Sequence, residues 1–255
     1  AGCSVTKGDD NSYVVSSGLT EVDAAAAIGT QYYGSPTAAV NAAADGDTVT
    51  LLKDLNNSIS IASGKNVILD LNGHTISINR SSGTPIHNSG TLVIKDTSAG
   101  QTGKVENMAS TNGIAVYNAT SRASVTITGG TFATNSATSN YGHNTVCAMY
   151  GSFTITTGID VNGNTTVPKF TNTSGSVVIV SDSASLDIQA GIFEGNSTSG
   201  TLLVKNNAAV SVSGGTFVNN HATGPAVKLD SQKATLSITG GTYSTDVAEY
   251  CADGY

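Results

Sequence analysis

The octapeptide VTITGGTF at residues 125–132 contains an apolar–polar alternation followed by glycine and an aromatic residue. Four further copies are FTITTGID at 153–160, LDIQAGIF at 186–193, VSVSGGTF at 210–217 and LSITGGTY at 236–243. Looser copies begin at residues 68 and 92, so that successive copies start 24 to 33 residues apart. Such an interval, without a helical pattern, favours one coil of a β-solenoid over a strand–helix–strand unit.

Each copy alternates two aliphatic residues with two polar ones, as expected of a strand with one buried face. The predicted inward columns are Val125, Phe153, Leu186, Val210 and Leu236, with Ile127, Ile155, Ile188, Val212 and Ile238 beside them. Glycine follows because the chain turns a corner where a side chain would clash. The residues predicted to stack on the next face are Phe132, Phe193, Phe217 and Tyr243. A second apolar strand precedes each copy, as in AVKL at 226–229.

These features predict an all-β protein, a right-handed parallel β-helix of about eight rungs with a rod length of about 40 Å. We expect residues 1–30 to form an extended N-terminal arm and residues 31–255 a single β-helix domain. Within that domain a short capping helix is predicted at about 36–44, because Pro36 suits a first helical turn. The rungs are predicted at about 48–244 and a C-terminal cap at about 245–255.

Composition excludes several classes of protein. The chain has 31 serines and 34 threonines, and only 11% of its residues are charged, which does not suit a helical bundle. No apolar run approaches the roughly 20 residues of a membrane span, so no membrane insertion is expected. A net charge of −7 without a cluster of lysines or arginines argues against a nucleic acid partner.

Several segments resemble a known group of proteins. They are IGTQYY at 28–33, AAVNAAADGDTVTLLKD at 38–54, NVILDLNGHTI at 66–76 and GGTYSTDVAEYCADGY at 240–255. Over about residues 28–255 the chain resembles bacterial cell-surface proteins of the pectin-lyase-like, right-handed parallel β-helix type. The resemblance implies a secreted or surface-displayed, extracellular protein. It departs from the usual pattern at Cys251, where an apolar residue such as valine is common.

Enzymes of the pectin-lyase-like type place clustered aspartates and a base on one face, whereas the acids of this chain are scattered. Asp70 and Asp96 occupy similar places in consecutive rungs and are the weak candidates for a carbohydrate site. The alternation within LDL at 69–71 favours a solvent-facing side chain for Asp70. The four histidines fall in separate rungs without ligand spacing. The sequence therefore predicts no catalytic residue, metal ion or cofactor.

Three cysteines are too few for a disulfide scaffold. Cys147 lies in an apolar run and is predicted to be a buried thiol. Cys3 and Cys251 lie near the two termini. If the arm stays near the first rung, they are about one rod length apart, far beyond the roughly 7 Å between Cα atoms that a disulfide allows. A bond between them would join two copies head to tail. An arm folded back along the rod would allow the same bond within one chain.

We therefore predict a non-catalytic protein with a structural or adhesive role, such as a subunit of an extracellular filament. Its expected partners are further copies, bound end to end or through the N-terminal arm, or a surface glycan or host protein. The first alternative is a carbohydrate-active enzyme or a glycan-binding module. A lesser alternative is ice binding by the outward threonine columns, although these columns also contain Asp187 and Gln189.

Overall fold

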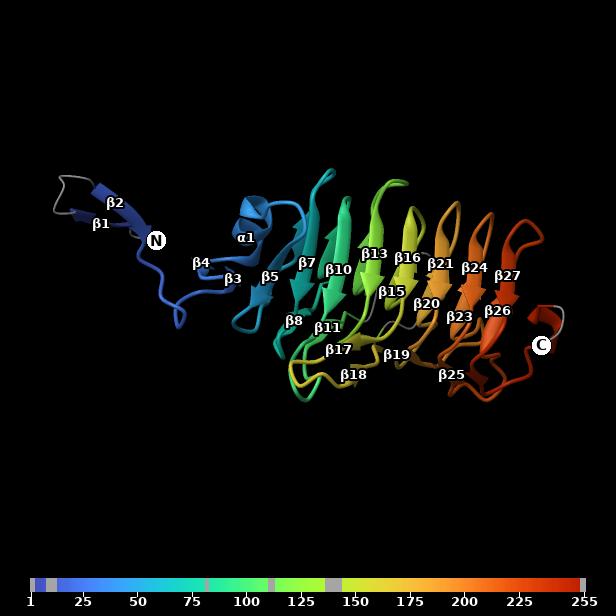
Figure 1. Ribbon diagram of the computed structural model, residues 1–255. Coiled ribbons are helices and arrows are strands. Elements are labelled where there is room, and N and C mark those ends of the chain that lie inside the picture. Colours follow the sequence, from blue (N-terminus) through green and yellow to red (C-terminus); the bar gives the residue numbers. More distant parts are fainter. Residues whose placement is uncertain (1–2, 8–12, 81–82, 110–112, 136–143, 253–255) are drawn as a thin grey trace.

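The computed structural model describes residues 3–7, 13–80, 83–109, 113–135 and 144–252. The protein is a right-handed parallel β-helix of about six turns (Figure 1). Each turn contributes a short strand to each of three sheets, and strands of successive turns pair side by side. The predicted fold class is confirmed, with somewhat fewer turns than the predicted eight rungs.

Sheet 1 contains ten of the described strands and begins with an antiparallel hairpin. In spatial order they are β27 Thr235–Ile238, β24 Ala209–Val212, β21 Ser185–Ile188, β16 Ser152–Ile155, β13 Ser124–Ile127, β10 Thr91–Lys95, β7 Asn66–Asp70, β5 Asp47–Leu51, β3 Ala26–Ile28 and β4 Gln31–Tyr33. The strands from β5 to β27 are parallel to one another. β3 pairs antiparallel with both β4 and β5.

Sheets 2 and 3 each contain seven of the described strands, all parallel. Sheet 2 consists of β28 Thr242–Tyr243, β25 Thr216–Asn219, β22 Ile192–Gly195, β19 Lys169–Asn172, β14 Thr131–Thr134, β11 Lys104–Asn107 and β8 Thr75–Ile78. Sheet 3 consists of β26 Val227–Leu229, β23 Leu202–Val204, β20 Val178–Val180, β15 Val146–Ala148, β12 Val116–Asn118, β9 Ile86–Asn88 and β6 Ile59–Ile61.

The remaining described elements are two hairpins and two short helices. Helix α1, Pro36–Ala42, has Ser35 as its N-cap, with the hydroxyl accepting a hydrogen bond from the Ala38 amide. The 3₁₀-helix η1, Ala248–Tyr250, follows the last turn. Strands β1 Cys3–Lys7 and β2 Tyr13–Ser17 form a hairpin within the predicted arm. Among the described residues no helix is long and apolar enough to cross a membrane.

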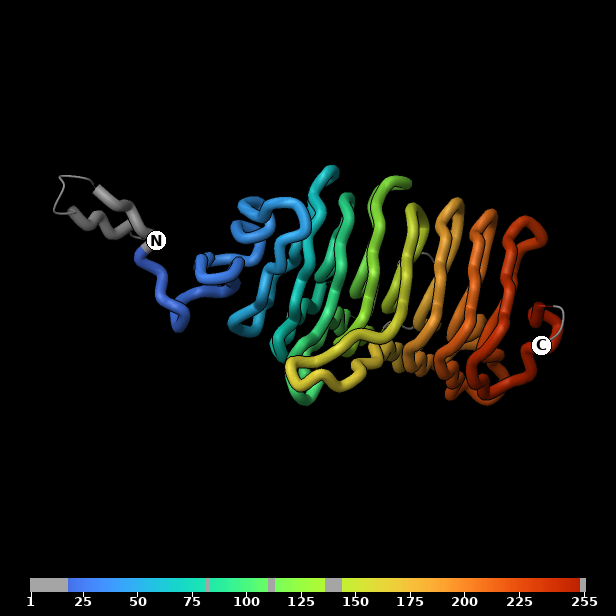
Figure 2. The backbone as a smooth tube through the Cα atoms, viewed as in Figure 1, coloured from blue at the N-terminus to red at the C-terminus, as the bar shows by residue number. Residues whose placement is uncertain are grey.

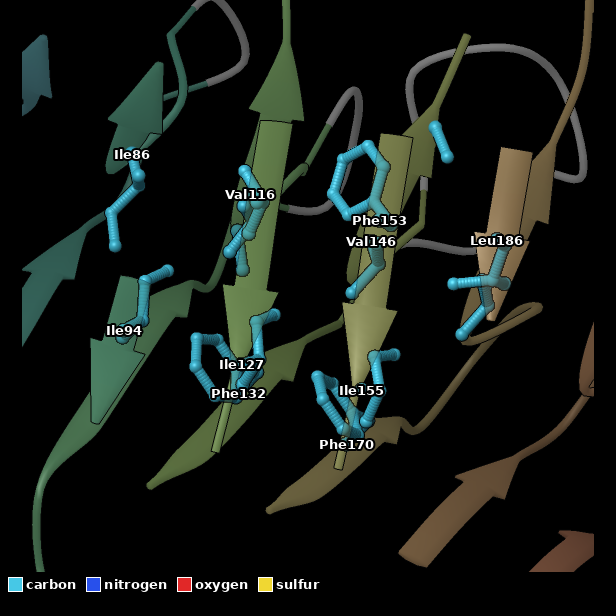
Figure 3. Close-up of a cluster of buried hydrophobic side chains, with 14 of the residues drawn as sticks. Ile86, Ile94, Val116, Ile127, Phe132, Val146, Phe153, Ile155, Phe170 and Leu186 are labelled. Atoms are coloured by element: carbon cyan, nitrogen blue, oxygen red, sulfur yellow. The ribbon is translucent and has the colours of Figure 1, made fainter. Parts of the chain in front are cut away.

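Repeating columns of side chains fill the interior. In sheet 1 the register aligns the two inward columns that the alternation predicts, from Val125 to Leu236 and from Ile127 to Ile238. In sheet 2 five aromatic rings stack with neighbouring centroids 4.6 to 5.1 Å apart: Phe132, Phe170, Phe193, Phe217 and Tyr243. Figure 3 shows Phe132 and Phe170 beside the sheet 1 side chains Ile127 and Ile155.

The sequence predicts four of the five stacked rings and misses Phe170. In the copy at 153–160, the motif predicts the sheet 2 strand directly after the glycine. In the structure a hairpin of β17 Gly158–Ile159 and β18 Thr165–Thr166 occupies that place, and the sheet 2 strand follows later in the chain. Phe170 follows the hairpin and pairs in register with Phe132 and Phe193. An inserted hairpin therefore lengthens the turn without breaking the stack.

Tight corners join sheet 1 to sheet 2. Gly215 and Gly241 have φ angles of 102° and 110°, which side chains rarely adopt. A Cβ at Gly214 would lie 2.3 Å from the carbonyl oxygen of Gln189 in the previous turn. The glycines after the strands are therefore required by backbone conformation and by close approach, as the sequence pattern predicts.

Candidate functional site

Asp70, at the end of β7, lies in a corner rather than in solvent. Its side chain is buried, which corrects the prediction of a solvent-facing strand residue. One carboxylate oxygen accepts hydrogen bonds from the amides of Asn72 and Thr97, at 3.0 and 3.1 Å. The other accepts from the Thr97 hydroxyl at 2.7 Å and lies 3.7 Å from the Lys95 ammonium. The carboxylate therefore joins the corner of its own turn to that of the next turn.

Asp96 follows β10 and also joins corners of neighbouring turns, through hydrogen bonds from three backbone amides. Its side chain is 1% exposed. Oδ1 accepts from the amides of Gly73 and Ser98, at 2.9 and 3.2 Å, and Oδ2 accepts from the Gly103 amide at 2.6 Å. A Cβ at Gly103 would lie 2.7 Å from the carboxylate, so only glycine fits against it. A buried carboxylate held by three backbone amides is a strong local constraint.

The two candidate acids do not share one register position. The parallel register places Asp70 opposite Lys95, so Asp96 lies one residue further along the chain than the counterpart of Asp70. Each carboxylate faces its own set of backbone donors. What the two residues do chemically in this structure is accept hydrogen bonds that hold corners of the β-helix.

Asparagines perform a similar task at the other corners, and the sequence analysis did not single them out. Asn88 and Asn118 are fully buried and joined side chain to side chain at 2.9 Å, at the corner between sheets 3 and 1. At the corner between sheets 2 and 3, Asn107 and Asn219 donate to corner carbonyl groups. A recurring asparagine two residues after the stacked position of sheet 2 was the available signal, as in FTN at 170–172 and FVN at 217–219.

Glu106 lies on β11 in sheet 2 and has two close polar partners. It accepts a hydrogen bond from the Ser77 hydroxyl at 2.8 Å and forms an ion pair with Lys104. Burial by itself raises the pKa of the Glu106 carboxyl. The hydrogen bonds from Lys104 and Ser77 and the charge of Lys104 outweigh burial, so the pKa lies below its ordinary value.

The outward columns of sheet 1 are those that the sequence predicts, with Thr126, Thr154, Asp187, Ser211 and Ser237 in register. A shallow hollow of about 320 Å³ lies over the turns of β16 to β27, lined by hydroxyl groups and Asp187 together with apolar side chains such as Leu186 and Val210. The carboxylate accepts from the Ser211 hydroxyl and from the Gln189 amide, both at 2.7 Å. This surface offers hydrogen-bond donors and acceptors to a polar ligand.

The cysteines differ in environment. Cys147 is fully buried beside Ile179 and Leu203, as predicted. Cys251 is half-buried, pairs with Ile238 in an isolated bridge, and its thiol lies 3.6 Å from the carbonyl oxygen of Val247. Cys3 is the first residue of β1, opposite Ser17.

No group of three or more histidine, cysteine, aspartate or glutamate side chains that could hold a metal ion occurs among the described residues. His74 lies 3.4 Å from Asp54, and the ring of His87 contacts that of Tyr117, so these two histidines have separate surroundings. In comparisons with known proteins, no family model, no curated protein and no solved structure matches the chain.

Proposed function

We propose that this protein is a non-catalytic structural or adhesive rod, secreted or displayed at a cell surface, and a subunit of an extracellular assembly. The observation that carries this proposal is the continuous interior, in which five aromatic rings stack through successive turns. In a solenoid each turn packs on its neighbours, so an unbroken stack makes a stiff, elongated element.

The use of the acids supports the same proposal. Asp70 and Asp96 direct their oxygens at backbone amides, where they stabilise corners. The resemblance to pectin-lyase-like surface proteins of bacteria supports an extracellular location and agrees with the parallel β-helix fold. A hydroxyl-rich surface with few charges fits a spacer that contacts glycans or other chains through hydrogen bonds.

The test compares two aspartates of different expected roles. Asp96→Asn replaces one of the two accepting oxygens with an NH₂ donor that faces a backbone amide. We expect it to lower the free energy of unfolding, measured with urea, by about 2 kcal/mol. Asp187→Asn, on the outward face, is the matched control, with an expected change within about 0.5 kcal/mol. Both variants and the wild type are assayed for lyase and hydrolase activity on a polysaccharide panel. Cleavage by the wild type that Asp96→Asn abolishes, at a temperature where that variant is folded, would contradict a structural role.

A glycan-binding module is the second candidate, favoured by the hollow around Asp187, which combines polar and apolar lining side chains. Sugar hydroxyls would exchange hydrogen bonds with Thr154, Asp187 and Ser211. If this surface binds a glycan on an array, Asp187→Ala lowers binding at least tenfold. Glu194→Gln, which changes an acid on sheet 2, is the control and leaves binding unchanged. Equal binding by wild type and Asp187→Ala places any glycan site elsewhere.

A further inference from the structure

The first strands of the described chain form a sheet of their own. β1 and β2 pair antiparallel from Cys3–Ser17 to Lys7–Tyr13, and no other described strand joins them. An isolated two-stranded hairpin is marginally stable in water at best. Another hairpin of this chain is stabilised by joining a larger sheet, because β3–β4 adds to β5 of sheet 1 through antiparallel pairing.

The opposite end of sheet 1 has no such hairpin in the described chain. β27 is the last described strand of the sheet, and among the described residues only its final residue, Ile238, is bridged on the outer side, by Cys251. Leu236, Leu229 and Tyr243 of the last turn are only partly buried. Their counterparts one turn earlier, Val210, Val204 and Phe217, are at most 4% exposed. A strand edge that is largely unpaired among the described residues, beside partly exposed apolar side chains, is a ready site for another strand.

The β1–β2 hairpin cannot reach the outer edge of β27 in its own chain. Ala24 is buried at the start of the first turn, and the seven peptide steps from Ser17 to Ala24 span at most about 25 Å. β3 and β27 are eight strand positions apart in sheet 1 (Figure 1), or about 38 Å at about 4.8 Å per strand. The C-terminal edge of a second copy has no such restriction.

We propose that the β1–β2 hairpin of one copy adds to β27 of a second copy, in a head-to-tail contact. This proposal rests on the assembly role proposed above and names its partner as the same chain. The outer side of Ile238 is occupied by Cys251 and by the Ala252 amide, which donates to the Ile238 carbonyl at 2.9 Å. When β1 runs antiparallel to β27, as β3 does to β5, it pairs with the residues of β27 before Ile238, and its first residue, Cys3, comes next to Cys251 of the acceptor. A contact between two different surfaces that does not close into a ring builds an open filament.

The two cysteines give the proposal a covalent readout. With an oxidised small disulfide such as glutathione disulfide, one thiolate first forms a mixed disulfide and releases one glutathione thiol. The second protein thiolate then displaces the other glutathione, so two protein thiols are oxidised and one glutathione disulfide is reduced. Cys147 takes no part, because it is fully buried.

The experiment uses the full chain with Cys3→Ser, Cys251→Ser or neither, incubated with glutathione disulfide and run on non-reducing gels. We expect a ladder from the wild type and, from an equimolar mixture of the two variants, a dimer of twice 25.6 kDa. Each variant alone should give at least tenfold less dimer than the mixture. Wild type that stays a monomer with an internal disulfide, a mixture without dimer, or equal dimer from Cys251→Ser alone would overturn the proposal.

A second variant tests docking without the disulfide. Val5→Pro removes a backbone donor from β1, the strand proposed to pair with β27, whereas Val5→Thr keeps strand propensity and is the control. In sedimentation under reducing conditions, we expect Val5→Pro to weaken self-association at least tenfold and Val5→Thr to leave it within twofold. Equal association of all three proteins contradicts hairpin docking. If electron micrographs then show isolated rods and the protein cleaves no glycan, hairpin docking is wrong but the proposed structural role still stands. The failure of one proposal can therefore be told from the failure of the other.

Discussion

The two ends of the β-helix are closed in different ways. At the N-terminal end the hairpin β3–β4 extends sheet 1, and α1 packs against it with Ala39 and Val40 fully buried. At the C-terminal end, the described residues after the last turn form η1 and the bridge from Cys251 to Ile238. Leu51 in the first turn is consequently 0% exposed, whereas Leu236 in the last remains partly exposed. Among the described residues, the N-terminal end of the β-helix is therefore covered more completely than the C-terminal end.

The comparison predicts that the same substitution has unequal effects at the two ends. Leu51 and Leu236 both point inward from sheet 1. Leu51→Ala leaves a cavity in a closed environment, and we expect it to lower the free energy of unfolding by about 3–4 kcal/mol. Leu236→Ala removes a partly exposed side chain and should cost about 1–2 kcal/mol.

Urea unfolding measures both losses, and hydrogen exchange locates them. β27 should exchange its amides faster than β5 in the wild type, because the last turn opens more readily. Equal losses for the two variants, or faster exchange in β5, would show that the ends are equally well closed.

Tyr243 is the last ring of the aromatic stack, and its ionisation reports how well the last turn is closed. Burial, with a smaller effect of the nearby Cys251, raises the pKa of its phenol from 10.0 to about 12. Its hydroxyl donates to the Gly240 carbonyl at 2.7 Å, which also favours the neutral form. Because the pKa is raised in the folded state, stability present below pH 10 is lost as pH rises towards 12.

Because the Tyr243 side chain is partly exposed, we expect the free energy of unfolding to fall by roughly 1 kcal/mol between pH 10 and 12. Tyr243→Phe cannot ionise and should lack this part of the alkaline destabilisation. The difference between the near-ultraviolet titrations of wild type and variant isolates Tyr243 from the other tyrosines. A difference titration centred near 10 would show that the last turn leaves the ring in water.

The smallest expected effect concerns the ion pairs of sheet 2. The pKa of Glu106 is lowered, so its contribution is present above about pH 4.5 and disappears as pH falls through the folded value. Glu106→Gln should cost about 0.5 kcal/mol at neutral pH and nothing in acid. Glu194→Gln, which removes a more exposed partner 3.3 Å from Lys169, is the comparison nearer the C-terminal end and should cost less. A larger loss from Glu194→Gln would reverse this order.

The sequence predicts the repeating part of this structure well, because alternation and glycine corners recur with each turn. It fails where a turn departs from the repeat. Phe170 was missed because the β17–β18 insertion separates it from its own copy of the motif. Asp70 was placed in solvent because strict alternation does not hold at a corner, where Thr97 of the next turn covers the side chain.

The candidate site depended on contacts that one sequence does not reveal. Similar positions in consecutive copies suggested that Asp70 and Asp96 form a column, yet the register sets them one residue apart. The hydrogen bonds to Gly73 and Gly103 depend on where the following corner passes, and loop lengths vary between copies. Cys251, by contrast, is singled out by the sequence alone, through its place close to the C-terminal end of the given chain.

The hairpin β17–β18 has a mechanical consequence. It extends back along the rod from the turn of β16 (Figure 2), and the Val161 amide donates to the Thr97 carbonyl two turns earlier at 2.8 Å. Thr166 bonds the intervening turn through the Thr128 carbonyl, and Val167 bonds the side chain of Gln101. A rod pulled from its C-terminal end would thus peel one coil at a time until the force reaches this brace, where three coils resist together and release as a block.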